Sequence, residues 1–200
     1  ALPIFGSESA VFGAAANWTD GGASNNRGIY KWNLGQEATI SGNPSLGSVM
    51  ISSTSSPTLS SNMTLSGNLI LRKALNLTSN TIDLGTDGTL IEDGVLLSGT
   101  TGQIQANPTL NAPNAVNAAG LGAVISSGSN LGATQIIRYF DSENGNGLNS
   151  SIDRVYDITP TNNAGLNATL VFNYLDPGEL NGLTESDLEL YKSSNGGVSW

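Results

Sequence analysis

Short apolar runs alternate with turn-forming residues along the first half of the chain. In residues 67–93 the runs NLIL, ALNL, TIDL and TLIE are separated by Gly, Asn, Ser and Thr. Runs of this length between turn residues are typical of β-strands, whereas an amphipathic helix would repeat its apolar positions every three to four residues. The pattern predicts an all-β protein.

A glycine-led motif recurs in the same region. GSVMI begins at Gly47, GNLIL at Gly67 and GTLIE at Gly88, so successive copies are 20 and 21 residues apart. A period near 20 in β-type sequence is typical of a β-solenoid, or β-helix, with one coil per repeat. An antiparallel meander or sandwich is the alternative. In the solenoid, five apolar residues are expected to stack in register: Val49, Ile51, Leu69, Leu71 and Leu90.

Second strands are expected between these copies, at residues 63–66 and 81–84. Asn62 and Asn80 precede them. Because Asn tolerates the left-handed backbone conformation, we expect both residues to form tight corners there.

The length and the aromatic content of the apolar runs change towards the C-terminus. Residues 99–133 have weak strand patterns and read as a last coil and a linker, whereas longer runs with aromatic residues follow from residue 133. Residues 169–174 and 188–191 alternate as sandwich strands do. Around Thr184, Glu185 and Asp187 one helical turn is expected. We therefore predict a solenoid domain over residues 1–120 and a partial, truncated β-sandwich over residues 121–200.

Composition and charge narrow the possible functions. Only 12% of residues are charged, the net charge is −9, and the chain has no Cys and no His. An acidic chain repels phosphate backbones, so nucleic acid is not an expected partner. The usual zinc sites and Ser–His–Asp or Cys–His catalysis lack their residues. No apolar run is long enough for a membrane helix, and the absence of Cys fits an exported bacterial protein.

The segment from Arg154 to Trp200 resembles a β-sandwich segment of large secreted surface proteins of the Bacteroidota, many of them exported by the type IX system. The matching residues are 157–160 (DITP), 165–170 (GLNATL) and 179–182 (ELNG). Residues 40–100 are similar to the Asn- and Thr-rich β-helical repeats of such proteins. The resemblance implies an extracellular, adhesin-like setting and a chain that is part of a longer protein, and it implies little about activity.

The last residues, SSNGGVSW, resemble an Asp-box, with Asn195 in the position of the usual Asp. In proteins that carry this motif it closes a β-hairpin: a polar side chain caps the turn, Gly permits it, and Trp packs beneath. We expect the same structural role for Ser193, Asn195, Gly197, Ser199 and Trp200.

Two groups of acidic residues are candidate sites. The carboxylates of Asp83, Asp87, Glu92 and Asp93 lie within one predicted coil. A pair of them on one face at the right separation would suit glycoside hydrolysis, although turn and surface roles are the simpler interpretation. The loop DSENGNG offers oxygen ligands for a possible calcium ion, which binds six to eight oxygens, from Asp141, Glu143, Asn144 and Asn146. An ion-free, Asn-rich turn is the alternative there.

Aromatic residues gather near the N-terminus, at Trp18, Tyr30 and Trp32. They suit sugar stacking, but they equally suit capping of the first coil, since terminal repeats must cover an open core.

These observations favour an extracellular structural or adhesin-like surface or fibre module without catalytic or cofactor-binding residues. We expect it to associate with other surface proteins or with copies of itself by strand-edge pairing. The alternative is a carbohydrate-binding or polysaccharide-degrading module of a secreted enzyme, with glycans as ligands.

Overall fold

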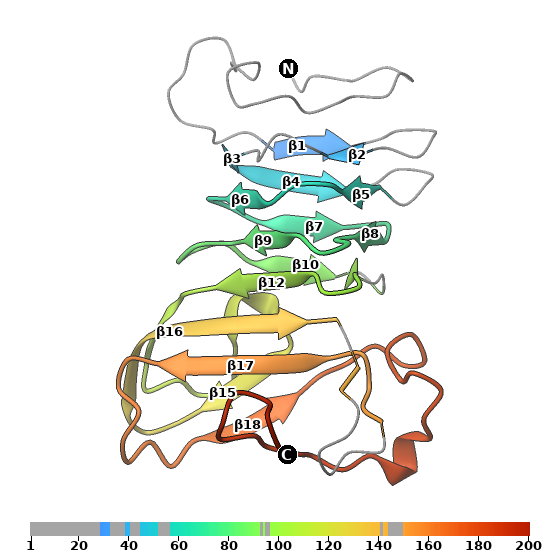
Figure 1. Ribbon diagram of the computed structural model, residues 1–200. Helices are drawn as coiled ribbons and strands as arrows, with labels where there is room; N and C mark the ends of the chain where they lie inside the picture. Colours follow the sequence, from blue (N-terminus) through green and yellow to red (C-terminus); the bar gives the residue numbers. More distant parts are fainter. Residues whose placement is uncertain are drawn as a thin grey trace.

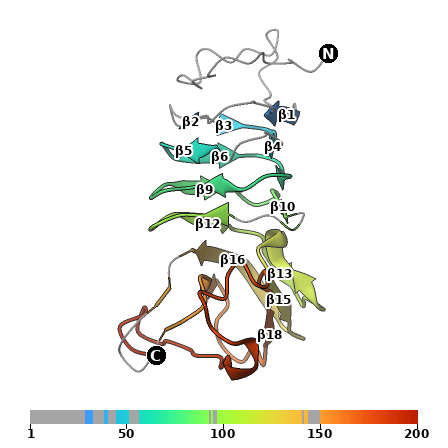
Figure 2. The ribbon, with the colours of Figure 1, turned by 90° about the vertical axis from the view of Figure 1, so that its right-hand side faces the viewer.

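The computed structural model describes residues 29–32, 39–40, 45–51, 57–92, 94, 97–140, 142–143 and 150–200. They form a parallel β-helix whose coils stack along one axis and which ends in a partial β-sandwich (Figure 1 and Figure 2). The all-β prediction is confirmed, because the only helices in this part of the chain are the short 3₁₀ turns η2 (Ala118–Gly120) and η3 (Glu185–Asp187).

Three stacks of parallel strands form the faces of the β-helix. The first face contains β1 (Ile29–Trp32), β4 (Ser48–Ile51), β7 (Leu69–Leu71) and β10 (Leu90–Glu92). The second contains β2 (Thr39–Ile40), β5 (Thr58–Leu59), β8 (Leu75–Asn76) and β11 (Leu97–Ser98). The third contains β3 (Ser45–Leu46), β6 (Met63–Leu65), β9 (Thr81–Asp83) and β12 (Gln103–Ala106). Each coil therefore contributes one strand to every face.

The strand register confirms the predicted stacking. Val49 pairs with Leu69, which pairs with Leu90, and Ile51 pairs with Leu71. All five predicted residues are buried, and they belong to one core with the inward residues of the other two faces. Alternation of inward apolar and outward polar residues on strands as short as three residues is therefore enough to build this core.

The recurring glycines lie at a corner where successive coils touch. A Cβ atom on Gly88 would lie 2.4 Å from the carbonyl oxygen of Leu84 and 2.6 Å from that of Gly67. On Gly67 it would lie 3.1 Å from the carbonyl oxygen of Gly47. The period of the motif thus marks a column of close backbone contacts that excludes larger residues.

Gly88→Ala is expected to lower the free energy of unfolding by about 1–3 kcal/mol, because the new methyl group overlaps backbone atoms that have little room to move. Gly128→Ala is the matched control, since a Cβ atom there meets nothing within 4 Å. Denaturant unfolding of both variants measures the difference. Equal stability of the two would contradict the corner role.

The two corner asparagines work differently from the prediction. Neither Asn62 nor Asn80 has a positive φ; Thr78, with φ of 54°, is the left-handed residue there. Instead the side chains bridge coils. Asn62 Oδ1 accepts a hydrogen bond of 2.9 Å from the N–H of Thr81, and Asn80 Nδ2 donates one of 2.7 Å to the carbonyl oxygen of Leu59. The prediction of positive φ was wrong because an amide that satisfies a neighbouring coil stabilises the corner without a strained backbone.

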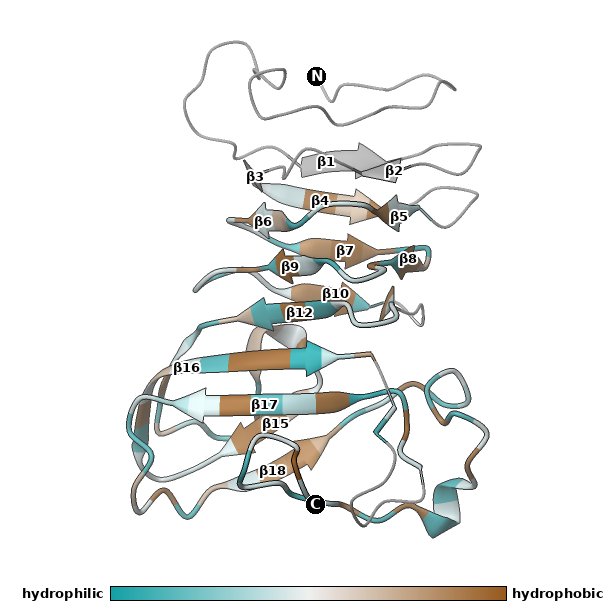
Figure 3. Ribbon diagram, viewed as in Figure 1, coloured by the Kyte–Doolittle hydropathy of each residue, from teal (hydrophilic) through white to brown (hydrophobic). Residues whose placement is uncertain are grey.

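The sandwich continues the third face of the β-helix. The long strand β16 (Asn130–Tyr139) pairs antiparallel with β12, with Ile136 opposite Ala106, and then with β13 (Thr109–Asn111). On its other edge β16 pairs with β17 (Val155–Pro160). Hydrophobic and hydrophilic segments alternate along β16 and β17 (Figure 3). The second layer is β14 (Val116–Asn117), β15 (Ala123–Ser126) and β18 (Thr169–Phe172).

Two sequence-based expectations for this region were wrong. Residues 99–133 contain β12 to β15 and the start of β16 rather than a linker, because small buried residues such as Ala118 and Ala123 pack in place of large ones. Residues 188–191 alternate like a strand but form none, and Leu190 remains 76% exposed, so no sheet neighbour covers that segment. The single turn at η3 is confirmed, although the side chain of Thr184 makes no capping hydrogen bond.

The domain boundary near residue 120 stays a prediction. Hydrogen bonds between β12 and β16 cross it, and one hydrophobic core contains both coil residues and Ile136 and Phe140 of the sandwich. No helix in the described part of the chain is long and apolar enough to cross a membrane.

Candidate functional site

The last coil carries a carboxylate inside the β-helix. Glu92 pairs in register with Leu71 and so occupies the inward position that Ile51 and Leu71 fill in the coils before it. Arg138 reaches it from β16, where it lies opposite Ile104. The guanidinium donates two hydrogen bonds of 2.8 Å, one to each carboxylate oxygen of Glu92. This bidentate pair connects the β-helix to the sandwich.

A second ion pair lies beside the first. Arg154 donates from Nε and Nη2 to Glu179 Oε1, at 3.0 and 2.6 Å. The other oxygen of Glu179 accepts the N–H of Leu175 at 2.7 Å, and Arg138 Nη2 lies 3.3 Å from Glu179 Oε1. Two arginines and two glutamates therefore neutralise one another in what we call the junction cluster, Glu92, Arg138, Arg154 and Glu179.

Burial sets the electrostatics of this cluster. Burial alone would lower the pKa of Arg138, but its hydrogen bonds to Glu92 and the charge of that carboxylate outweigh the burial and raise the pKa. The guanidinium also lies 4.9 Å from the centroid of the Phe140 ring, a cation–π contact. Within the described residues only its Nε is buried without a hydrogen-bond partner.

The backbone of Gly122 closes over the junction cluster. Its φ is +90°, and a Cβ atom there would lie 2.7 Å from Arg154 Nη1 and 2.8 Å from the hydroxyl of Tyr156. That hydroxyl donates a hydrogen bond of 2.7 Å to the carbonyl oxygen of Leu121, and burial raises the pKa of Tyr156. The cluster is thus tightly packed, and apart from Arg138 Nε its charged groups are paired with one another, which suits a structural role.

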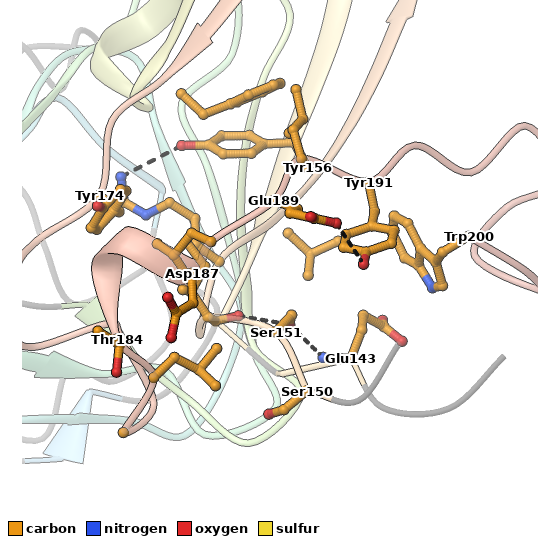
Figure 4. Close-up of a pocket in the computed structure, with 18 of the residues that line it drawn as sticks. Glu143, Ser150, Ser151, Tyr156, Tyr174, Thr184, Asp187, Glu189, Tyr191 and Trp200 are labelled. Atoms are coloured by element: carbon orange, nitrogen blue, oxygen red, sulfur yellow. Dashed lines mark hydrogen bonds between the residues drawn. The ribbon is translucent and has the colours of Figure 1, made fainter. Parts of the chain in front are cut away.

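An open pocket of about 520 Å³ lies next to the junction cluster, on the side of the sandwich where β17 and β18 face each other. Val155 and Tyr156 of β17 line it together with Phe172 of β18, and the segment around η3 and Trp200 completes it. In the view of Figure 4, Tyr191 and Trp200 lie on one side of the pocket and Asp187 and Thr184 on the other.

Aromatic rings form much of this pocket. Tyr156 and Phe172 both line the pocket and contact each other across the two layers of the sandwich, with ring centroids 5.0 Å apart. Tyr174 donates its hydroxyl to Glu185, and this hydrogen bond raises the pKa of Tyr174 to about 12. Tyr191 donates to Glu189 Oε2 at 3.2 Å, which raises its pKa also. Both hydroxyls are committed to carboxylates, so they are not free to donate to a ligand.

Carboxylates give the pocket its charge. Glu143, Asp187 and Glu189 line it, and among the described lining residues the only cation is Arg154, which Glu179 already neutralises. The site therefore combines aromatic surface with unbalanced negative charge.

Of the four carboxylates that the sequence groups in one coil, the three that are described lie on different parts of it. Asp83, on the third face, accepts hydrogen bonds from the N–H of Gly85 at 2.8 Å and from Gln105 Nε2 at 3.0 Å. Asp87 accepts one of 3.0 Å from the hydroxyl of Thr86. Glu92 lies inside the first face, bound to Arg138, and Asp93 is outside the described residues. The hydrogen bonds of Asp83 and Glu92 to neighbouring side chains favour the structural interpretation of these carboxylates.

Most of the predicted calcium loop falls outside the described residues, namely Asp141, Asn144 and Asn146. Glu143 is described: its N–H donates to Ser151 Oγ at 2.8 Å, and the residue lines the pocket. Within the described residues no three His, Cys, Asp or Glu side chains are grouped so as to hold a metal ion. Calcium binding stays a prediction.

The N-terminal aromatic group is likewise largely outside the described part of the chain. Trp18 is not described, and Tyr30 and Trp32 are described only as backbone of β1. Their roles in capping or sugar binding stay predictions.

The Asp-box-like turn closes as expected. Ser193 Oγ accepts the N–H of Gly197 at 2.8 Å, and Asn195 Oδ1 accepts that of Ser199 at 3.1 Å. Gly196 and Gly197 have positive φ values of 70° and 82°. The flanking hairpin strands are absent from residues 188–200, all of which are described, so the motif here is a turn without its hairpin.

The junction cluster was not predicted, although the sequence contains its pattern. Arg138 shares the inward parity of Ile136 on β16 and of Phe140, which directly follows that strand. Glu92 takes the place of Ile51 and Leu71 in the third copy of the glycine-led motif. A charged residue at an inward position of each of two strands is the pattern of a buried ion pair. Comparison of the chain with protein-family models, with curated proteins and with solved structures gives no match.

Proposed function

We propose that this chain is a non-catalytic structural module of an extracellular surface protein, and that it associates with an extended protein segment at the open side of its sandwich. The observation that carries the proposal is a pair of unpaired strand edges. Among the described residues β17 pairs only with β16, and β18 pairs only with β15. Such edges accept an additional strand from another chain.

The free edge of β18 can be assigned residue by residue. Asn173 donates its N–H to the carbonyl oxygen of Gly122, so in an antiparallel ladder Val171 also directs its backbone groups towards β15. Leu170 and Phe172 then direct theirs away from the sheet. Leu170 and Val171 are 39% and 54% exposed, so apolar surface accompanies the free backbone groups.

Charge favours a partner that is different from this chain. Two copies would bring together surfaces that each belong to a chain of net charge −9, and like charges directly opposite one another destabilise strand pairs. The carboxylates beside the open edges favour a segment with basic residues.

The extracellular setting follows from composition and resemblance. A chain without cysteine suits export from a bacterium that does not rely on disulfides, and residues 157–182 resemble secreted surface proteins. In this setting the β-helix acts as a rigid spacer, and the ion-paired junction cluster keeps the sandwich fixed to its end.

A strand-addition assay tests the proposal. Ten-residue peptides that alternate valine and threonine, with two of the threonines replaced by either lysine or glutamate, are titrated against the purified chain and followed by fluorescence anisotropy. We expect the lysine peptide to bind. Leu170→Pro should weaken it by about tenfold, because proline removes a backbone donor and blocks the approach of the new strand.

Leu170→Ala is the matched control, since it truncates the same side chain but keeps the N–H group. It should bind the lysine peptide within about threefold of the wild type. Circular dichroism verifies that both variants fold. Equal binding by the proline and alanine variants, or no binding of any peptide, would contradict strand addition at β18.

Carbohydrate binding is the second candidate function, and the observation that favours it is the aromatic lining of the pocket by Tyr174, Tyr191 and Trp200. Affinity electrophoresis in gels that contain neutral or acidic polysaccharides tests it. Retardation that Trp200→Ala abolishes would support this candidate, and release of new sugar ends by the purified chain would overturn the non-catalytic proposal.

A further inference from the structure

We infer that the pocket beside β17 and β18 is a receptor for a cationic side chain, lysine or arginine, carried by the segment that docks on the open side of the sandwich. This inference rests on the proposed function and adds the chemistry by which the partner is selected. The pocket volume of about 520 Å³ accommodates one such side chain together with part of its backbone.

Negative charge without a counter-ion is the first observation. Asp187 and Glu189 are exposed carboxylates that line the pocket, and Glu143 lines it from the segment between β16 and β17. Arg154 does not balance them, because its Nη2 lies 2.6 Å from Glu179 Oε1 and its Nη1 donates to the carbonyl oxygen of Asn173. An incoming cation would therefore meet an unpaired negative field.

The aromatic faces are the second observation. Tyr191 and Trp200 line the pocket on the side of Glu189, and the hydroxyl of Tyr191 is held by that carboxylate at 3.2 Å. A cation over a tryptophan or tyrosine face gains electrostatic stabilisation from the ring quadrupole. Rings and carboxylates around one cavity make a site for an ammonium or guanidinium group.

The negative charge of the lining favours a cationic ligand over a neutral sugar. Each sugar hydroxyl both donates and accepts, so a sugar site needs donors as well as acceptors. Here the hydroxyl of Tyr174 is donated to Glu185, that of Tyr191 to Glu189 and that of Ser151 to the carbonyl oxygen of Ile152. The hydroxyls of Ser150 and Thr184 and the indole N–H of Trp200 remain as donors. The three lining carboxylates accept hydrogen bonds and also carry charge, which suits a ligand that only donates, as ammonium and guanidinium groups do.

Three small probes separate the possibilities: N-acetyl-lysine methylamide, its neutral analogue N-acetyl-norleucine methylamide, and methyl glucoside. Each is titrated against the isotope-labelled full chain, and the indole N–H resonance of Trp200 is followed by nuclear magnetic resonance. We expect the lysine probe to shift this resonance, the norleucine probe to shift it at least about fivefold more weakly, and binding of lysine to weaken as sodium chloride rises from 50 to 500 mM.

The variant Asp187→Asn/Glu189→Gln removes two charges from the pocket while keeping side-chain size. It should weaken lysine binding by about tenfold. Asp87→Asn/Asp157→Asn is the matched control: it removes the same charge from two exposed positions that do not line the pocket, and it should bind as the wild type does.

Equal binding of the lysine and norleucine probes, a response to methyl glucoside alone, or an equal loss in both double variants would overturn the inference. The outcome is separable from that of the proposed function. If the lysine probe binds but the peptides do not add as strands, the receptor site stands and the proposed strand docking is refuted. If the peptides add as strands equally well in the Asp187→Asn/Glu189→Gln variant, strand docking stands and the receptor site is refuted.

Discussion

Arg138→Leu is expected to lower the free energy of unfolding by about 3–5 kcal/mol, the range found when one partner of a buried ion pair is removed. Arg138 is fully buried, and it gives both of its Nη groups to Glu92 at 2.8 Å. Without it, the carboxylate of Glu92 inside the last coil loses both short hydrogen bonds and keeps only the longer ion pair with Arg154 Nη2, at 3.9 Å. Thermal and denaturant unfolding measure the loss.

A double variant separates the cost of leaving Glu92 without its partner from the net contribution of the ion pair to the free energy of unfolding. Glu92→Leu/Arg138→Leu replaces both charges by apolar side chains, and leucine at position 92 extends the column formed by Ile51 and Leu71. Replacement of a buried pair by apolar residues is often neutral, so we expect the double variant to recover most of the stability lost in Arg138→Leu. A loss below about 1 kcal/mol in the single variant would contradict a structural role for the pair.

Sequence pattern predicted the β-helix well for a physical reason. Each coil buries residues of alternating parity, and Val49, Leu69 and Leu90 must recur at the coil length to meet inside. Glycine recurs for a similar reason, because backbone meets backbone at the corner of Gly67 and Gly88. In a solenoid the period of the sequence equals the length of a coil, so the same repeat determines both the local strand pattern and the packing between coils. A short stretch of sequence therefore predicts both.

The candidate site was less predictable, since it depends on contacts between distant residues. Glu92 and Arg138 are 46 residues apart, and Tyr156 meets Phe172 across two layers that only the complete fold brings together. Local sequence also misled at residues 188–191, where strand-like alternation is present but no neighbouring strand satisfies the backbone. A strand requires a partner, and a pattern in one segment does not supply it.

Leu71→Ala is expected to cost about 2–5 kcal/mol, the range for a buried leucine whose removal leaves a cavity. Leu71 is fully buried in the middle of its column, between Ile51 and Glu92. Ile91→Ala is the matched control, because Ile91 lies on the next strand but is 42% exposed, and it should change stability by about 0.5 kcal/mol. A loss in Leu71→Ala no larger than in the control would mean that the column does not support the fold.

The same variant tests whether the β-helix and the sandwich unfold together. One hydrophobic core runs from the coils to Phe140, and β12 pairs with β16 along four residues. We therefore expect one cooperative transition, in which Leu71→Ala lowers the midpoint equally for the far-ultraviolet signal of all strands and for the near-ultraviolet signal of aromatic residues such as Tyr156 and Phe172. If the aromatic signal instead kept the midpoint of the wild type, the sandwich would be an independent domain, and the boundary near residue 120 would be a boundary of stability as well as of sequence.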